Sequence, residues 1–222
     1  MSAEGGDPST PLARWAGGSA LAEAALYLLS FAGLALQPRP EASATLAQKL
    51  DFVLAHRALF QLWAPFYLAS GALLVPLALG LHARLKDRAP ALLPVATSFA
   101  LIWAGLLLAS GLVGGVGLRA VARLHLQDPA QAVPVWASLN VVQDALGGGV
   151  EVVGGLWTFL ISLAALRARR FPRLINGLGL AVGLAGILTL VPGWGDLAAL
   201  FGIGQIPWFL GLGLGLLRRP AA

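Results

Sequence analysis

Long uncharged stretches dominate the pattern of hydrophobic and polar positions along the chain. Residues 58–81, 89–118 and 174–195 contain no Asp, Glu, Lys or Arg. A bilayer core of ~30 Å is crossed by about 20 apolar residues in a helix, so each stretch is long enough to span it. The alternating ten-residue pattern of a membrane β-barrel is missing. The pattern therefore predicts an integral membrane protein built from helices.

Six segments have the length and apolar content of a transmembrane helix, namely residues 17–36, 59–81, 92–115, 146–166, 174–192 and 197–217. The polar connection 37–57 is long enough for a short surface helix or irregular structure. The sequence PGWGD at 192–196 predicts a tight turn. We expect an all-α, polytopic transmembrane bundle of six helices, a single domain over 17–217, with flexible tails at 1–16 and 218–222.

The basic residues are distributed unequally between the two sides of this predicted bundle. Of 15 Lys and Arg, ten fall on the side of the termini and five on the other. The first group is Arg14, Arg84, Lys86, Arg88, Arg167, Arg169, Arg170, Arg173, Arg218 and Arg219; the second is Arg39, Lys49, Arg57, Arg119 and Arg123. The positive-inside rule then places both termini in the cytoplasm, in a multi-pass inner-membrane protein. The charges lie in short loops, which favours contact with lipid headgroups and not with nucleic acid.

Several classes of chemistry are excluded by what the sequence lacks. The chain has no cysteine, so disulfides, thiolate catalysis and Cys-ligated metals are ruled out. It contains no phosphate loop, Gly-x-Ser-x-Gly elbow or His-Glu-x-x-His motif. Glu4, Asp7 and two prolines occupy the first 14 residues, where a secretory signal would be basic. We therefore predict no cofactor and no cleaved leader, and we lean against an enzyme.

Polar residues and glycines form one stripe along the predicted fourth span, which begins in NVVQDALGGGVEVVGG at 140–155. Steps of three or four residues place one set on a single helix face: Asn140, Asp144, Gly147, Glu151, Gly155, Thr158 and Ser162. A charge facing lipid costs ~2.5–3.5 kcal/mol, so this face should point into the bundle or a wet cavity. Glu151 lies about 22 Å from the cytoplasmic edge at Leu166, and Asp144 lies beyond ~30 Å, at the outer interface.

These depths define candidate ligand-binding residues: Asn140, Gln143, Asp144, Glu151 and Arg57. By depth, Arg57, Arg119 or Arg123 is the nearest partner for Glu151. Glu151 is then either a structural ion pair that fixes helix register or part of a ligand, proton or ion site. Glu23 is a second intramembrane acid, about 9 Å inside the cytoplasmic edge and closest in depth to His82 and Arg84.

A metal site on the outer side is a further candidate, formed by Asp51, His56 and His125, with Asp128 nearby. Carboxylate and imidazole are common ligands of zinc and related ions. Asp51 and His56 are five residues apart and do not share a helix face, so they would need an irregular segment to meet. The alternative is that all of these residues are interfacial and solvated.

Glycine pairs at 111/115, 179/183 and 211/215 have the Gly-x-x-x-Gly spacing that lets helices approach closely.

The carboxy-terminal half contains the stretch GGLWTFLISLAALRARRFPRLINGLGLAVGLAGILTLVP, followed by LFGIGQIPWFLGLGLGLLRRP. This half resembles a family of six-span bacterial membrane proteins catalogued only as a domain of unknown function. The shared features are a Trp-bearing span, a short basic loop with Pro before a Gly-rich span, and a final Trp-containing span with a basic end. The resemblance implies a bacterial inner-membrane location and no particular activity.

Three functions remain open. The first is a membrane protein that binds a small or lipophilic ligand, or conducts a solute or proton, through a cavity lined by Asn140, Asp144 and Glu151. The second is a membrane-embedded, metal-dependent enzyme acting on lipid through Asp51, His56, His125 and Asp144. The third is an accessory or scaffold subunit whose polar stripe meets a partner helix. We favour the first and third, because no local motif supports the enzyme.

Overall fold

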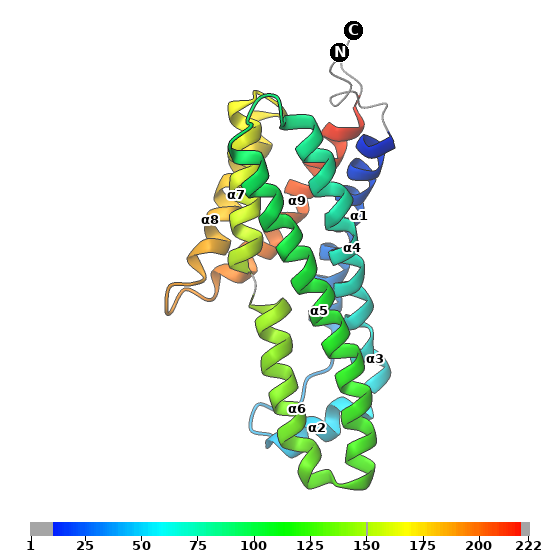
Figure 1. The fold of residues 1–222 in the computed structure, drawn as a ribbon. Coiled ribbons are helices and arrows are strands. Elements are labelled where there is room, and N and C mark those ends of the chain that lie inside the picture. Colours follow the sequence, from blue (N-terminus) through cyan, green and yellow to red (C-terminus); the bar gives the residue numbers. More distant parts are fainter. Residues whose placement is uncertain (1–10, 150, 219–222) are drawn as a thin grey trace.

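The computed structural model describes residues 11–149 and 151–218. Within these ranges every regular element is helical, which confirms the predicted all-α class (Figure 1). The elements are α1 (Pro11–Leu36), α2 (Leu46–Ala55), α3 (Arg57–Gln61), α4 (Trp63–Leu85), α5 (Leu92–Gln127), α6 (Pro129–Gln143), the π-helical turn η2 (Asp144–Gly148), α7 (Glu151–Arg167), α8 (Arg173–Leu188) and α9 (Leu197–Leu217).

Five helical stretches of the described residues are long and apolar enough to cross a membrane, one fewer than predicted: Pro11–Leu36, Arg57–Leu85, Leu92–Gln127, Pro129–Arg167 and Leu197–Leu217. The fifth predicted span, 174–192, is not among them and contains α8, an apolar helix of 16 residues. Its helix ends at Leu188 because the chain turns there. Thr189 donates its hydroxyl to the carbonyl of Gly186, and Gly193 has a φ of 87°.

Six helices close into a ring in which each one packs on two neighbours (Figure 1). α1 packs on α4 and α9, α5 on α4 and α7, and α8 on α7 and α9. The start of α1 and the end of α9 meet where Leu217 lies against Gly17. We name this the terminal end of the ring. The distal end, opposite to it, carries α2, α3 and the turn between α5 and α6.

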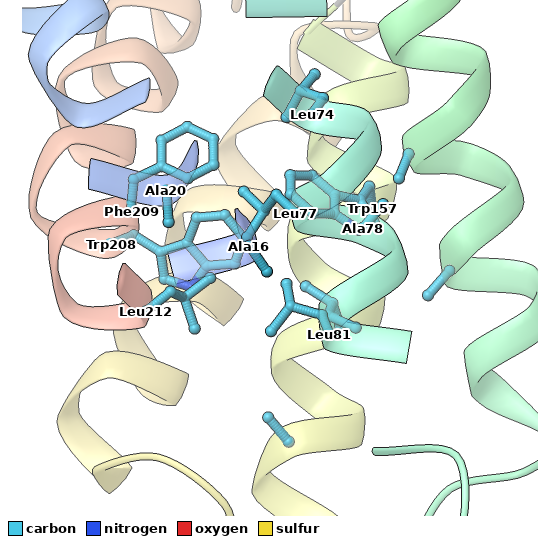
Figure 2. Close-up of a cluster of buried hydrophobic side chains, with 14 of the residues drawn as sticks. Ala16, Ala20, Leu74, Leu77, Ala78, Leu81, Trp157, Trp208, Phe209 and Leu212 are labelled. Atoms are coloured by element: carbon cyan, nitrogen blue, oxygen red, sulfur yellow. The ribbon is translucent and has the colours of Figure 1, made fainter. Parts of the chain in front are cut away.

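Bulky side chains fill the middle of the ring and extend toward the terminal end (Figure 2). The ring of Trp157, from α7, lies 5.7 Å from that of Trp103 on α5 and 5.4 Å from that of Trp208 on α9. Leu77 and Leu81 of α4 complete this core, and both are fully buried. We name it the aromatic core. The aromatic core does not fill the distal half of the ring, so a cavity can lie there.

At the distal end of the molecule, helices extend beyond the ring. α5 has 36 residues and is therefore about 54 Å long, well over the ~30 Å of a bilayer core. We predicted that this span would end at residue 115. The helix itself continues beyond that residue to Gln127, with Val121 on its buried face and Arg119 and Arg123 on its exposed side.

Of the two alternatives predicted for the connection 37–57, a short surface helix or irregular structure, the structure shows the helix, α2. Thr45 and Gln48 form a reciprocal capping box at its start. Its Leu50 packs with Val121 of α5 and Ala132 of α6 in a second, smaller core, which we name the distal core. A short helix with only one apolar side is stable here because α5 and α6 cover that side.

The predicted fourth span is interrupted. α6 ends at Gln143, the π-helical turn η2 follows, and a new helix begins at Glu151. Three successive glycines, 147–149, weaken the helix at this point, and π-helical turns are a recognised way for a helix to change direction.

At the amino terminus, residues 11–16, predicted to belong to a flexible tail, form the start of α1, where Ala13 and Ala16 are buried. The rest of that tail, 1–10, and residues 219–222 lie outside the described ranges.

Close helix packing at the predicted glycine pairs is confirmed. A Cβ atom at Gly183 would lie 2.5 Å from the backbone nitrogen of Phe159 and 2.8 Å from the carbonyl oxygen of Gly155. A Cβ at Gly111 would lie 2.9 Å from the carbonyl oxygen of Ala64. Gly215 is closed off by the ring of Phe171. These glycines allow α8 to touch α7 and α5 to touch α4 backbone to backbone.

Candidate functional site

A cavity of about 300 Å³ lies in the distal half of the ring, and we name it the central cavity. Side chains from α1, α4, α5, α7 and α9 line it, together with Gly147 of η2: Leu26, Tyr27, Ser30, Phe31, Leu34, Trp63, Phe66, Tyr67, Ser70, Trp103, Leu107, Glu151, Ala198, Phe201 and Gly202. Five separate helices therefore meet around one space. None of them could form the site alone.

The lining of the central cavity has an unusual composition for this chain. Seven of its 16 residues are aromatic, against 8% in the whole protein. The chain has two tyrosines, Tyr27 and Tyr67, and both lie here. Among the described residues that line the cavity, Glu151 alone bears an acidic or basic side chain. The site is thus an aromatic chamber with a single carboxylate.

Glu151 is the first residue of α7 and is half-buried. An acid in the first turn of a helix interacts favourably with the helix dipole. Within the described ranges Glu151 forms no ion pair. Arg57, Arg119 and Arg123, the partners suggested by depth, are all exposed. Similar depth therefore did not predict an ion pair, because these arginines are exposed whereas Glu151 is half-buried.

Glu23 lies behind one wall of the central cavity, at 0% exposure. The hydroxyl of Ser70, a lining residue, donates to it at 2.8 Å from Oε2 and 3.1 Å from Oε1. The sequence predicted that Glu23 lies closest in depth to His82 and Arg84, and its hydrogen-bond donor, Ser70, is a different residue. α1 and α4 are antiparallel with Ala16 beside Gly80, so His82 lies nearer the terminal end, where its Nδ1 is 2.7 Å from Oγ1 of Thr97.

The aromatic core closes the central cavity on the terminal side. Trp103 and Phe201 line the cavity and also contact each other, with ring centres 6.0 Å apart. Trp103 continues into the core through Trp157. Its Nε1 is buried and has no hydrogen-bond acceptor in the part of the chain that the structure describes. The cavity is therefore a chamber with a floor, and a buried donor belongs to one of its lining residues.

A second space of about 410 Å³, the distal cavity, adjoins the first. Leu34, Trp63 and Tyr67 line both. The distal cavity is more polar, with four carboxamides and one acid: Gln37, Gln61, Asn140, Gln143 and Asp144. Nε1 of Trp63 donates to Oε1 of Gln37 at 2.8 Å, which fixes the indole at the boundary. The two adjoining cavities therefore differ in character, since the distal one is polar and the central one aromatic.

The structure divides the predicted ligand-binding residues between these two spaces. Asn140, Gln143 and Asp144 line the distal cavity, whereas Glu151 lines the central one. Arg57 lies exposed on α3 and lines neither. The π-helical turn η2 causes the division, because it separates residues that a continuous helix would place on one face.

The terminal part of the predicted polar stripe is committed to packing and hydrogen bonding. Oγ1 of Thr158 accepts from Nε2 of Gln205 at 2.9 Å, and Oγ of Ser162 accepts from Nε1 of Trp208 at 3.2 Å. Gly155 faces Gly183 across the contact between α7 and α8. These residues face the interior as predicted and are already paired, so the stripe reaches a cavity only through its distal residues.

The predicted metal ligands are only partly assembled. Nε2 of His125 lies 3.4 Å from Oδ1 of Asp51, which joins α5 to α2. His56 is elsewhere, with its Nδ1 2.9 Å from the carbonyl oxygen of Phe52 in its own helix turn. No group of three His, Asp or Glu that could hold a metal ion occurs among residues 11–149 and 151–218.

Tyr27, Tyr67, Ser70 and Trp103 line the site and were not predicted from the sequence. The sequence did contain a cue for some of them, because polar side chains within apolar spans, such as these two tyrosines and the serine, tend to face the interior of a bundle. Their convergence depends on how α1, α4 and α5 rotate in the ring, which the sequence pattern does not specify.

Comparison with family models, curated proteins and solved structures finds no match to this chain. The function is therefore argued from the chemistry of the two cavities.

Proposed function

We propose that the protein is a bacterial inner-membrane protein of six spans that binds a small lipophilic ligand in the central cavity. The observation that carries the proposal is a carboxylate without a basic partner inside an aromatic chamber. Small-molecule sites have this character: concave, mostly apolar, with few polar groups and a volume of roughly 300–1,000 Å³. Here the polar groups are Glu151, the two tyrosines, Ser30 and Ser70, together with the indole N–H groups of Trp63 and Trp103.

The six-span arrangement is supported by the ring itself. α8 takes the same place between α7 and α9 as the longer helices take between their neighbours. Its 16 residues extend over about 24 Å, a length that local thinning of a bilayer accommodates at modest cost. The resemblance of the carboxy-terminal half to six-span bacterial membrane proteins agrees with this arrangement.

The orientation of the ring follows from its charges. The terminal end carries the dense basic segments, with Lys86 and Arg88 after α4, Arg167 at the end of α7, and Arg169 and Arg170 after it. We therefore place the terminal end in the cytoplasm. The distal cavity then opens on the outer side and gives the ligand its route to the central cavity.

Binding is favoured over continuous conduction by the aromatic core. A solute or proton crossing the ring would have to pass Trp103, Trp157 and Trp208, which are all fully buried in the core. The enzyme alternative has less support, because His56 does not join Asp51 and His125.

Photolabelling tests the proposal. A small lipophilic aryl diazirine should label peptides containing Tyr27 and Tyr67 in protein reconstituted in lipid nanodiscs. Ala198→Trp should abolish this labelling by filling the cavity that Ala198 lines. Ala199→Trp, at the adjacent exposed position of α9, is the matched control and should leave labelling intact. Equal labelling in both variants would overturn the proposal.

The structural alternative for Glu151 is tested separately. Glu151→Gln should fold and unfold thermally like the wild type, because no ion pair is lost. A large loss of expression and thermal stability would show that the acid serves the fold and not a ligand.

A further inference from the structure

We infer that the ligand of the central cavity is an organic cation, such as a lipophilic amine or quaternary ammonium compound, bound between Glu151 and the surrounding rings. This inference rests on the proposed function and names the chemical class of its ligand. Three independent features of the cavity point to a cation: the sign of its charge, the nature of its walls and the distribution of its polar groups.

The first feature is charge. The chain carries 15 basic and 10 acidic residues, yet no Lys, Arg or His is among the described residues that line the central cavity. The lining carboxylate is that of Glu151, and the second nearby acid is Glu23, behind Ser70. A neutral or anionic ligand that displaced water from the half-buried carboxylate of Glu151 would leave it without a counter-ion, which is costly. A cation supplies the missing charge.

The second feature is the aromatic wall. A cation within about 6 Å of a ring centre is attracted by the ring quadrupole, by ~0.5–1 kcal/mol at exposed sites and ~2 kcal/mol or more when desolvated. Seven rings line the central cavity: Tyr27, Phe31, Trp63, Phe66, Tyr67, Trp103 and Phe201. Rings on α1, α4, α5 and α9 surround the space, so an ammonium group inside it has aromatic neighbours in several directions.

The third feature is the separation of polar groups between the cavities. The carboxamides that suit neutral hydrogen-bonding ligands, such as Asn140 and Gln143, lie in the distal cavity. The central cavity contains hydroxyl groups, two indole N–H groups and the carboxylate, and no carboxamide. A quaternary ammonium group donates no hydrogen bond and needs no carboxamide partner. The interior therefore suits a charge surrounded by apolar groups.

A purely structural role for Glu151 explains less. An acid at the start of α7 is stabilised by the helix dipole, and that effect accounts for its position in the chain. It does not account for the aromatic residues that four other helices place around it. An experiment that compares ligands of one shape and different charge separates the two explanations.

The experiment uses benzyltrimethylammonium and its neutral carbon isostere, neopentylbenzene, as competitors of the diazirine probe in nanodiscs. In the wild type, the cation should halve labelling at a concentration at least ~10-fold lower than the isostere, equivalent to about 1.4 kcal/mol. Glu151→Gln should reduce this preference to within about twofold, and Glu151→Asp should retain most of it. Glu41→Gln removes an exposed acid outside the cavity and should change nothing.

A second measurement does not depend on the folding of a variant. Dicyclohexylcarbodiimide modifies carboxyl groups in apolar surroundings, and mass spectrometry locates the adduct. Benzyltrimethylammonium should slow modification of Glu151 in the wild type several-fold. Neopentylbenzene at equal occupancy should have a smaller effect, and modification of exposed Glu41 should be unaffected by either compound.

The outcomes separate the two proposals. Equal protection by cation and isostere would overturn the cation inference and leave a cavity that binds lipophilic ligands. A cation preference that persists in Glu151→Gln would overturn the role given to Glu151. Labelling that neither competitor nor Ala198→Trp affects would overturn the proposed function itself.

Discussion

The hydroxyl of Ser70 on α4 is the hydrogen-bond donor to Glu23 on α1, at 2.8 Å and 3.1 Å from the two carboxyl oxygens. The residues are 47 positions apart in the chain, and both are buried. Together they join two helices that otherwise pack through small and apolar side chains. Ser70 also lines the central cavity, so this contact links the stability of the ring to the wall of the site.

Ser70→Ala should destabilise the protein by about 1–3 kcal/mol, because it leaves a buried carboxyl group without its donor. Ser98→Ala is the control, since exposed Ser98 donates only to the carbonyl of Pro94 in its own helix. Thermal unfolding in detergent measures both variants. Equal midpoints for the two would contradict the prediction.

Glu23→Gln should be tolerated better than Ser70→Ala, because a carboxamide oxygen still accepts from Ser70.

The contact between α7 and α8 should not tolerate an added methyl group at Gly183. A Cβ there meets backbone atoms of Phe159 and Gly155 at 2.5 Å and 2.8 Å, and overpacking of this kind costs ~1–3 kcal/mol. Gly177→Ala, on the same helix but with nothing within 4 Å, should be neutral. Thermal unfolding of the two variants decides, and equal loss of stability would show that α8 adjusts freely.

The length of the apolar stretches predicted the helices well and their ends poorly. In α5, the first charge, Arg119, suggested an end at residue 115, but Val121 remains buried and the helix continues to Gln127. In the distal part of α5, charges lie on one side of the helix and apolar residues on the other. A scan for uncharged stretches does not recognise that pattern.

The candidate site was predicted in part. Periodicity placed Glu151 toward the interior, where it lines the central cavity. It gave no information on Tyr27 or Tyr67, because their meeting with Glu151 depends on the rotation of α1 and α4 within the ring. It also treated Asn140 and Glu151 as one face, whereas the π-helical turn between them directs them into different cavities. Local irregularity and helix rotation are tertiary properties.

The buried pair of Gln205 and Thr158 should respond asymmetrically to substitution. Oε1 of Gln205 has no partner among the described residues, although the side chain is 0% exposed. Gln205→Leu should therefore be close to neutral or stabilising. Thr158→Val should cost about 1–3 kcal/mol, because it leaves the amide donor of Gln205 unpaired. In the double variant the cost should largely disappear. Thermal unfolding of all four proteins tests this, and additive losses would contradict it.

The distal core, and not the ion pair beside it, should hold α2 in place. Leu50 is fully buried, so Leu50→Ala should cost ~2–5 kcal/mol. The side chains of His125 and Asp51 are 27% and 62% exposed, and such pairs contribute about 0–1 kcal/mol. Limited proteolysis of the connection 37–57 reports on the attachment of α2. Leu50→Ala should accelerate cleavage strongly and Asp51→Asn only slightly; the reverse order would assign the main role to the ion pair.

Single cysteines test the six-span arrangement directly, since the chain contains none of its own. Glu41, Asp87 and Asp196 are exposed and lie in the connections after α1, α4 and α8. With the termini in the cytoplasm, Glu41→Cys and Asp196→Cys should react with a membrane-impermeant maleimide in intact bacterial cells. Asp87→Cys should react only after permeabilisation. Asp196→Cys is the decisive variant, because α8 is the shortest helix of the ring: protection at this position in intact cells would mean that α8 does not cross the bilayer.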